Sequence, residues 1–104
     1  MEEQALRKIE SGRQVGKKFS FVKNGETYWA AVALQKHDEK YKVYFYDIME
    51  KDMAAENYWT EYKLLFSTLD EALLFISSNI NVDTNDLRPL TGSKIFDPNT
   101  IMST

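Results

Sequence analysis

The dipeptide Asn24-Gly25 stands between two segments of β character and constrains the possible folds most strongly. Residues 17–23 alternate between apolar and polar side chains, and residues 26–35 form a second, strongly apolar run. Both central residues of a type I′ turn need a positive φ, which Asn and Gly adopt more readily than other residues do. The sequence therefore predicts an antiparallel hairpin that starts a sheet.

The second strand of this hairpin is apolar on both of its faces. Every residue from Tyr28 to Leu34 is hydrophobic, so the alternation expected of a strand with one solvated face is missing. We therefore expect residues 26–35 to form a central strand or one that is covered on both sides.

Two further strands and two helices complete the expected fold. Residues 41–49 and 58–66 read as strands, with a loop or a single helical turn between them. Residues 1–12 contain a short amphipathic helix. Thr68 and Glu71 fit a capping box at the start of a second helix at 68–78.

These elements predict one α+β domain spanning residues 1–104. Its four-stranded, mostly antiparallel sheet lies within residues 17–66, between the N-terminal helix and the helix that follows the last main strand. The segment 79–104 holds Pro89, Gly92 and Pro98 and shows little periodicity, so we expect an irregular C-terminal segment.

The content of cysteine and histidine limits the chemistry of the chain. It has no Cys and one His, which excludes a disulfide framework, a thiolate metal site and a multi-histidine metal site. The single histidine, His37, lies beside Asp38 and Glu39 in a polar turn, where we expect an exposed side chain rather than a catalytic one. We expect no cofactor, no metal and no enzymatic activity.

The charge is unevenly distributed along the chain. The formal net charge is −3, with +3 in residues 1–46 and −6 in residues 47–104. This balance argues against nucleic acid as the main partner, because phosphate binding needs clustered Lys and Arg. The acidic start and the short apolar runs indicate neither a signal peptide nor a membrane span, so we expect a soluble, cytoplasmic protein.

An acidic cluster followed by two aromatic residues is the strongest candidate for a binding surface. A solvated acidic loop and a patch that meets a basic partner both explain the cluster, and a metal or catalytic role is the least favoured. Tyr and Trp are good interface anchors because they bury much area at a low entropic cost. The candidate partner-binding residues are Asp47, Glu50, Asp52, Glu56, Tyr58 and Trp59.

Thirteen of the fourteen aromatic residues lie between Phe19 and Phe75. Core packing or an interface explains them without any ligand. The alternative is a platform on which Tyr44 and Tyr46 stack single-stranded bases, but such a platform needs interleaved basic residues.

The order of the elements resembles that of the immunity proteins of bacterial polymorphic-toxin and contact-dependent growth inhibition systems. The resemblance covers residues 17–78 and rests on the strand Tyr41–Asp47, the strand Tyr58–Phe66 and the helix Thr68–Ile76. It implies a small acidic α+β protein that binds a cognate toxin domain and blocks it, and it carries over no site residue.

We therefore expect a non-enzymatic inhibitor that occludes a basic toxin domain, such as a nuclease. The alternatives are a small regulatory or adaptor domain of phage or bacterial origin with a non-toxin partner, a carboxylate-dependent enzyme near His37, and a single-strand binder.

Overall fold

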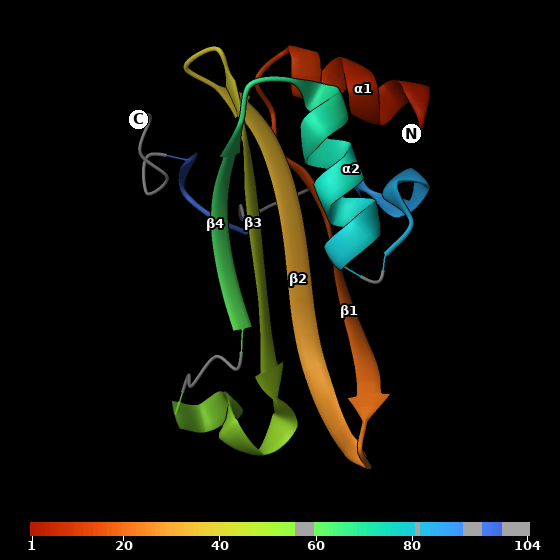
Figure 1. The fold of residues 1–104 in the computed structure, drawn as a ribbon, viewed down its shortest axis with the longest axis vertical. Helices are drawn as coiled ribbons and strands as arrows, with labels where there is room; N and C mark the ends of the chain where they lie inside the picture. The colour runs from red at the N-terminus through yellow and green to blue at the C-terminus, as the bar shows by residue number, and fades with distance from the viewer. Residues whose placement is uncertain (56–59, 81, 91–94, 99–104) are drawn as a thin grey trace.

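The computed structural model describes residues 1–55, 60–80, 82–90 and 95–98. Its strands form one antiparallel sheet in the order β4-β3-β2-β1-β5, with α2 lying over one face and α1 crossing one end (Figure 1). The α+β class and the two helices are thus confirmed. The elements are α1 (Glu3–Glu10), β1 (Val15–Lys23), β2 (Glu26–His37), β3 (Lys40–Met49), η1 (Glu50–Ala55), β4 (Thr60–Phe66), α2 (Leu69–Asn79), η2 (Thr84–Asp86) and β5 (Arg88–Pro89).

The first hairpin forms where Asn24-Gly25 predicts it. Asn24 has a φ of 52° and Gly25 a φ of 77°, as a type I′ turn requires. The strands pair from Lys23 opposite Glu26 to Val15 opposite Leu34, so β1 starts two residues earlier than predicted. The long pairing makes this hairpin a main structural unit of the sheet.

The second hairpin turns on two residues that rarely adopt this conformation. Asp38 and Glu39 both have positive φ, at 55° and 64°, and they connect β2 directly to β3. A left-handed conformation is uncommon for a residue with a side chain, and Glu adopts it less readily than Asn or Gly does. The strongly paired strands on both sides hold the turn in place.

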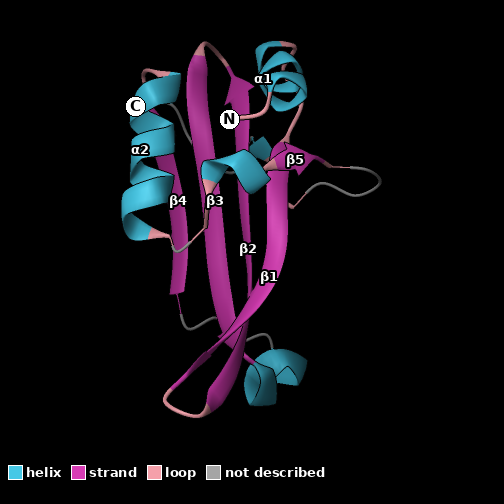
Figure 2. Cartoon of the chain, turned by 90° about the vertical axis from the view of Figure 1, so that its right-hand side faces the viewer, coloured by secondary structure: helices cyan, strands magenta, loops and turns pink. Residues whose placement is uncertain are grey.

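Strand β2 is buried on both faces from Ala30 to Gln35, as its apolar pattern predicts, whereas Trp29 is 41% exposed. On the face toward α2, Val32 and Leu34 join a core that includes Ile9 of α1 and Ile76 of α2. On the opposite face, Ala33 packs with residues of β3 and of the C-terminal segment. The sheet is therefore the middle layer of the fold (Figure 2).

Helix α2 begins at the predicted capping box. The Thr68 hydroxyl oxygen accepts a hydrogen bond from the Glu71 backbone N–H at 3.2 Å and donates one to the Glu71 carboxylate at 3.0 Å. These bonds satisfy one of the free N–H groups at the helix start and lock the Thr68 rotamer. The helix runs to Asn79, one residue beyond the prediction.

The sheet has a fifth strand that the sequence did not predict. Arg88 and Pro89 form β5, which pairs with Gly16 and Val15 at the edge of the sheet. The strand lies within the segment 79–104, which was expected to be irregular. Two residues give no periodic signal, and Pro is tolerated there because an edge strand needs only one bonded side.

Residues 95–98 cross the sheet on the face opposite α2, and in Figure 1 they pass behind the strands. The buried Gln14 side chain holds them by donating to the Phe96 carbonyl at 2.9 Å and accepting from the Ile95 N–H at 2.7 Å. Gly16 allows this close packing, since a Cβ there would lie 2.4 Å from the Val32 carbonyl oxygen and 3.0 Å from Ile95. Segments at opposite ends of the chain are thus joined through one amide.

Among the described residues, we find no helix with the length and apolar character needed to cross a membrane.

Candidate functional site

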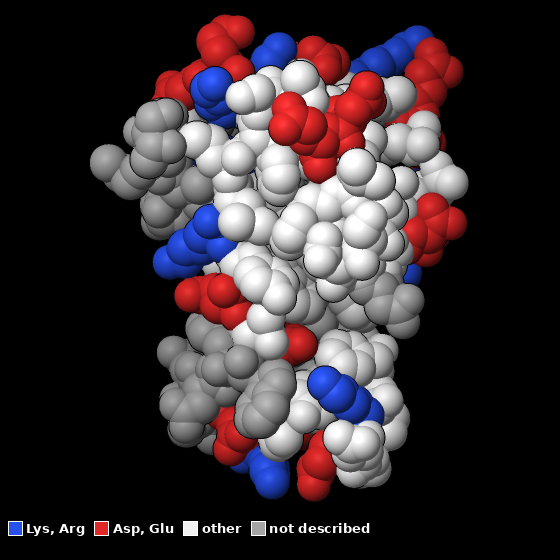
Figure 3. Space-filling view, viewed as in Figure 1, with Lys and Arg blue, Asp and Glu red and all other residues white. Residues whose placement is uncertain are grey.

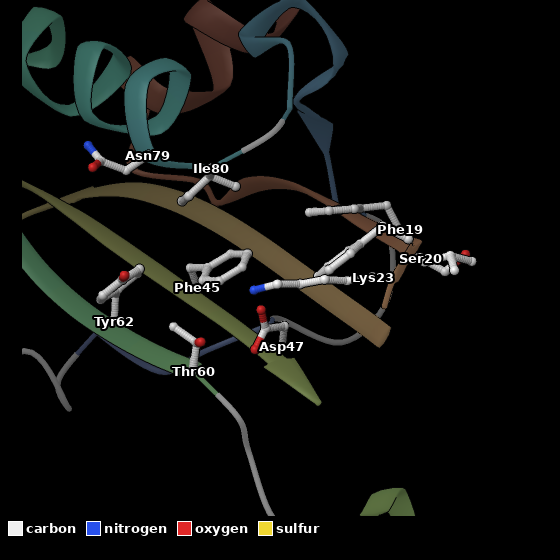
Figure 4. A pocket seen from close by; sticks show the side chains of 11 residues that line it. Phe19, Ser20, Lys23, Phe45, Asp47, Thr60, Tyr62, Asn79 and Ile80 are labelled. Atoms are coloured by element: carbon white, nitrogen blue, oxygen red, sulfur yellow. The ribbon is translucent and has the colours of Figure 1, made fainter. Parts of the chain in front are cut away.

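A groove of about 500 Å³ opens on the face of the sheet that carries α2. Helix α2 ends at Asn79, but the strands continue past it, so no helix of the described residues lies above the far half of this face (Figure 1). The side chains that would lie beneath a longer helix therefore line an open hollow. Its walls include Phe19, Phe21, Phe45, Asp47, Thr60, Tyr62, Asn79 and Ile80 (Figure 4).

Ring contacts hold the aromatic walls of the groove in place. Phe45 stacks on Tyr62 with ring centroids 5.8 Å apart, and Tyr62 meets Phe75 of α2 edge to face at 5.8 Å. On the other side, Phe21 stacks on Tyr28 at 5.2 Å. Each contact adds to the area burial and limits ring movement, so the groove is largely formed before anything binds.

Asp47 places a buried carboxylate in the wall of this groove. It lies on β3 between Ala30 of β2 and Thr60 of β4, and only 9% of the residue is exposed. One carboxylate oxygen, Oδ1, has no hydrogen-bond partner among the described residues. Buried polar atoms without a partner are rare and call for an explanation, such as a ligand or a role in binding.

The surroundings of Asp47 act on its pKa in opposite directions. Burial raises the pKa by penalising the charged form, while hydrogen bonds from Thr60 and the positive charge of Lys23 lower it. Burial has the largest effect, so the pKa lies above its ordinary value of 3.8. Figure 4 shows the exposed Lys23 side chain reaching across the groove with its amine toward Asp47.

The predicted binding residues divide into three groups. Asp47 was expected near the end of a strand, in an acidic cluster that meets a partner, but its side chain is buried in the wall of the groove. Glu50 is exposed and Asp52 is half-buried in η1, directly after β3. Glu56, Tyr58 and Trp59 lie outside the described residues.

The surface around the groove separates its charges from its apolar area. In the space-filling view of this face, the central area is mostly uncharged, and the charged side chains stand around it at the two ends and along both margins (Figure 3). Exposed Glu50 belongs to the end that also carries the groove. Lys23 and Lys51 are exposed at the same end, so both carboxylate and amine groups stand around the groove.

The histidine lies on the other face, in a cluster around a buried lysine. Lys42 is only 1% exposed, and its Nζ lies 3.0 Å from the Pro98 carbonyl oxygen and 3.1 Å from His37 Nδ1. The Asp38 carboxylate lies 3.2 Å from the same imidazole nitrogen. The Nδ1 atom accepts from Lys42 in one imidazole tautomer and donates to the Asp38 carboxylate in the other.

This cluster corrects the expectation of a freely exposed turn histidine. It also separates His37 from Asp47, because the two side chains lie on opposite faces and toward opposite ends of the sheet. They form no acid–base pair. Among the described residues, no group of three His, Cys, Asp or Glu is placed to hold a metal ion.

Tyr44 is covered rather than presented as a base-stacking surface. It is buried beneath Phe96, with ring centroids 5.7 Å apart, and its hydroxyl donates to the Glu61 carboxylate at 2.5 Å. A stacking platform needs an open ring face. The packing of Tyr44 therefore favours the core interpretation of this part of the aromatic set.

The most informative residues of the groove and of the opposite face were not predicted from sequence. Lys23, Lys42 and Gln14 read as ordinary polar positions in or next to strands. The alternation of β1 could have placed Lys23 on the same face as Phe19 and Phe21. No local signal marks the burial of Lys42 or Gln14, because the segment that covers them lies far along the chain.

Comparisons with protein-family models, with curated proteins and with solved structures find no match to this chain. The fold and the groove define a small α+β protein with a preformed hollow at one end of its sheet.

Proposed function

We propose that this chain is a non-enzymatic protein-binding inhibitor that presents the groove end of its sheet to a basic protein domain. The class we propose is that of immunity proteins that occlude a toxin, which the order of the elements resembles. The observation that carries the proposal is the aromatic groove, which contains a buried carboxylate oxygen without a partner among the described residues. The exposed acid Glu50 follows at the same end of β3, at the start of η1.

The electrostatics of the chain support a basic partner. The net charge is −3, and the half of the sequence that supplies β4, α2 and η1 carries the excess of acid. Exposed acidic residues raise the rate at which a positively charged partner is captured. The aromatic walls would then supply apolar contact area at the centre of the interface.

Occlusion is the mechanism that this surface suits. A toxin domain that acts on nucleic acid needs a positive cleft for phosphate. An acidic protein surface that sits over such a cleft excludes the substrate without any chemical step. A tight complex of this kind buries about 800 Å² on each partner.

The test starts by capturing the partner on the immobilised chain from a lysate of its source cells, at low and at moderate salt. The captured protein is identified by mass spectrometry, expressed and assayed for activity with and without the chain. We expect a basic protein that binds in a one-to-one complex and loses its activity when bound. A partner without toxic activity would instead favour the adaptor alternative.

A matched pair of charge reversals tests the steering. Glu50→Lys changes the charge next to the groove end of β3, and Glu39→Lys makes the same change at the opposite end, about 35 Å away along the strand. We expect Glu50→Lys to slow association several-fold at low salt and Glu39→Lys to leave it nearly unchanged. An association rate that is independent of salt, or equal in both variants, would rule out steering by this end.

A further inference from the structure

We propose that the groove is a receptor for one arginine side chain of the protein partner, with Asp47 as its counter-ion. The proposal rests on the proposed function for the source of the arginine. The groove itself is a separate claim, which can be tested without the partner.

The chemical need for a cationic donor comes from Asp47. Its Oδ1 atom is buried and accepts no hydrogen bond from the described residues, so it lacks the interaction that normally offsets the loss of water. A group that donates a hydrogen bond and carries a positive charge would satisfy the oxygen and stabilise the ionised carboxylate. Charge-assisted hydrogen bonds of this type are about twice as strong as neutral ones.

The walls favour a guanidinium over an ammonium group. Phe45 and Tyr62 form a stacked pair on one side, and Phe19 and Phe21 lie on another. A planar guanidinium can stack on such rings while it donates in its own plane, and it loses its hydration shell more easily than an ammonium group does. The volume of about 500 Å³ is in the range of pockets that take small ligands.

Lys23 is the natural competitor for this position. It is the charged group from β1 that interacts with Asp47, and Figure 4 shows its amine pointing toward the carboxylate. The side chain is exposed and flexible, so a guanidinium entering the groove can displace it. The inference therefore predicts that removing the charge of Asp47 weakens arginine binding, whereas removing the charge of Lys23 strengthens it.

The probe for the groove is N-acetyl-L-arginine methylamide, titrated into the full chain and followed by the backbone amide signals in two-dimensional NMR. The control probe is the corresponding citrulline compound, which is nearly isosteric but uncharged. We expect the arginine probe to shift the amide signals of Phe45, Asp47 and Thr60, with no saturable response to citrulline. Equal responses to both probes, or shifts that avoid these residues, would overturn the proposal.

Three variants then locate the charge effect. We expect Asp47→Asn to weaken arginine binding at least about tenfold, as the loss of a charge-assisted bond predicts. Glu39→Gln removes the same charge from an exposed residue at the opposite end of β3, so its affinity should stay within about twofold of the native chain. Lys23→Gln should tighten binding about twofold or more, since the competing cation is gone. Wild-type affinity in Asp47→Asn would overturn the proposal.

The same Asp47→Asn variant separates this inference from the proposed function. If a basic partner is captured and inhibited but binds the variant with native affinity, the arginine receptor is wrong and the proposed function stands. If the arginine probe occupies the groove and no basic protein is captured, the groove is a guanidinium site and the proposed function is wrong.

Discussion

Strand β3 carries two buried charges whose surroundings are opposite in kind. Lys42 and Asp47 lie about 17 Å apart along the strand, on different faces of the sheet. The lysine amine reaches the Pro98 carbonyl at 3.0 Å and the His37 imidazole at 3.1 Å. The aspartate leaves Oδ1 without a partner among the described residues.

The difference follows from what covers each end of the sheet. The C-terminal segment crosses over Lys42 and brings a backbone acceptor to its amine. Helix α2 ends at Asn79, short of a position above Asp47, so among the described residues the backbone donor to this carboxylate comes from Thr60 of β4 and not from the helix. The buried amine of Lys42 has its hydrogen bonds filled, whereas Asp47 keeps one buried oxygen, Oδ1, that a molecule binding in the groove can complete.

The largest expected loss of stability comes from detaching residues 95–98, the segment that covers Lys42. Replacing Gln14 by Leu leaves the Ile95 N–H, the Phe96 carbonyl and the Gln35 side chain without their buried partner. We expect a loss of about 3 kcal/mol in the free energy of unfolding, together with faster proteolysis near residues 95–98. Urea denaturation of the variant measures the loss, with the exposed Gln4→Leu as control. A loss below about 0.5 kcal/mol would show that the amide does not hold the segment.

A smaller effect is expected when the lysine itself is replaced. Lys42→Met keeps the length of the side chain and removes the charge, so the Pro98 carbonyl and His37 lose a donor. Because the apolar replacement also avoids burying a charge, we expect a net loss of about 1–2 kcal/mol. Thermal unfolding should show the loss, while Lys18→Met on the exposed side of β1 serves as control. A gain in stability would mean that the buried charge costs more than its bonds contribute.

The smallest effect on stability is expected at Asp47, toward the other end of β3, and it is a gain rather than a loss. The pKa of Asp47 is raised in the folded chain, mainly by burial, so the folded state binds the proton more tightly than the unfolded state. The native chain therefore loses stability as pH rises from about 3.8 through the folded pKa, and the loss is complete above it. Asp47→Asn removes this ionisation.

We expect Asp47→Asn to be more stable than the native chain at neutral pH, with a gain that shrinks as pH falls toward 3.8. Denaturation midpoints across this range measure it, and Glu50→Gln on the exposed loop should change stability by less than about 0.5 kcal/mol throughout. A variant that is less stable at neutral pH would show that the Thr60 hydrogen bonds outweigh the burial.

Local patterns in the sequence predicted the parts of the fold that local physics determines. Asn24-Gly25 defined the first hairpin, and Thr68 with Glu71 defined the start of α2, since both act within four residues. The two apolar faces of β2 correctly indicated a central strand.

The candidate site depended on longer-range contacts and was predicted only in part. Asp47 was selected for its charge, but its burial depends on where β4 pairs and where α2 ends. The cover over Lys42 comes from a residue 56 positions away. Neither the burial of Asp47 nor the cover over Lys42 can be predicted from a short window of sequence.

The separation between Lys42 and Pro98 also sets an order of events during synthesis. At about 5–20 residues per second, a ribosome adds the 56 intervening residues in about 3 to 11 s. Throughout that interval the amine at position 42 has no Pro98 carbonyl to bond, and one face of the emerging sheet stays open to water and to other chains. The native packing of this face therefore becomes available only after Pro98 has been added, 56 positions after Lys42.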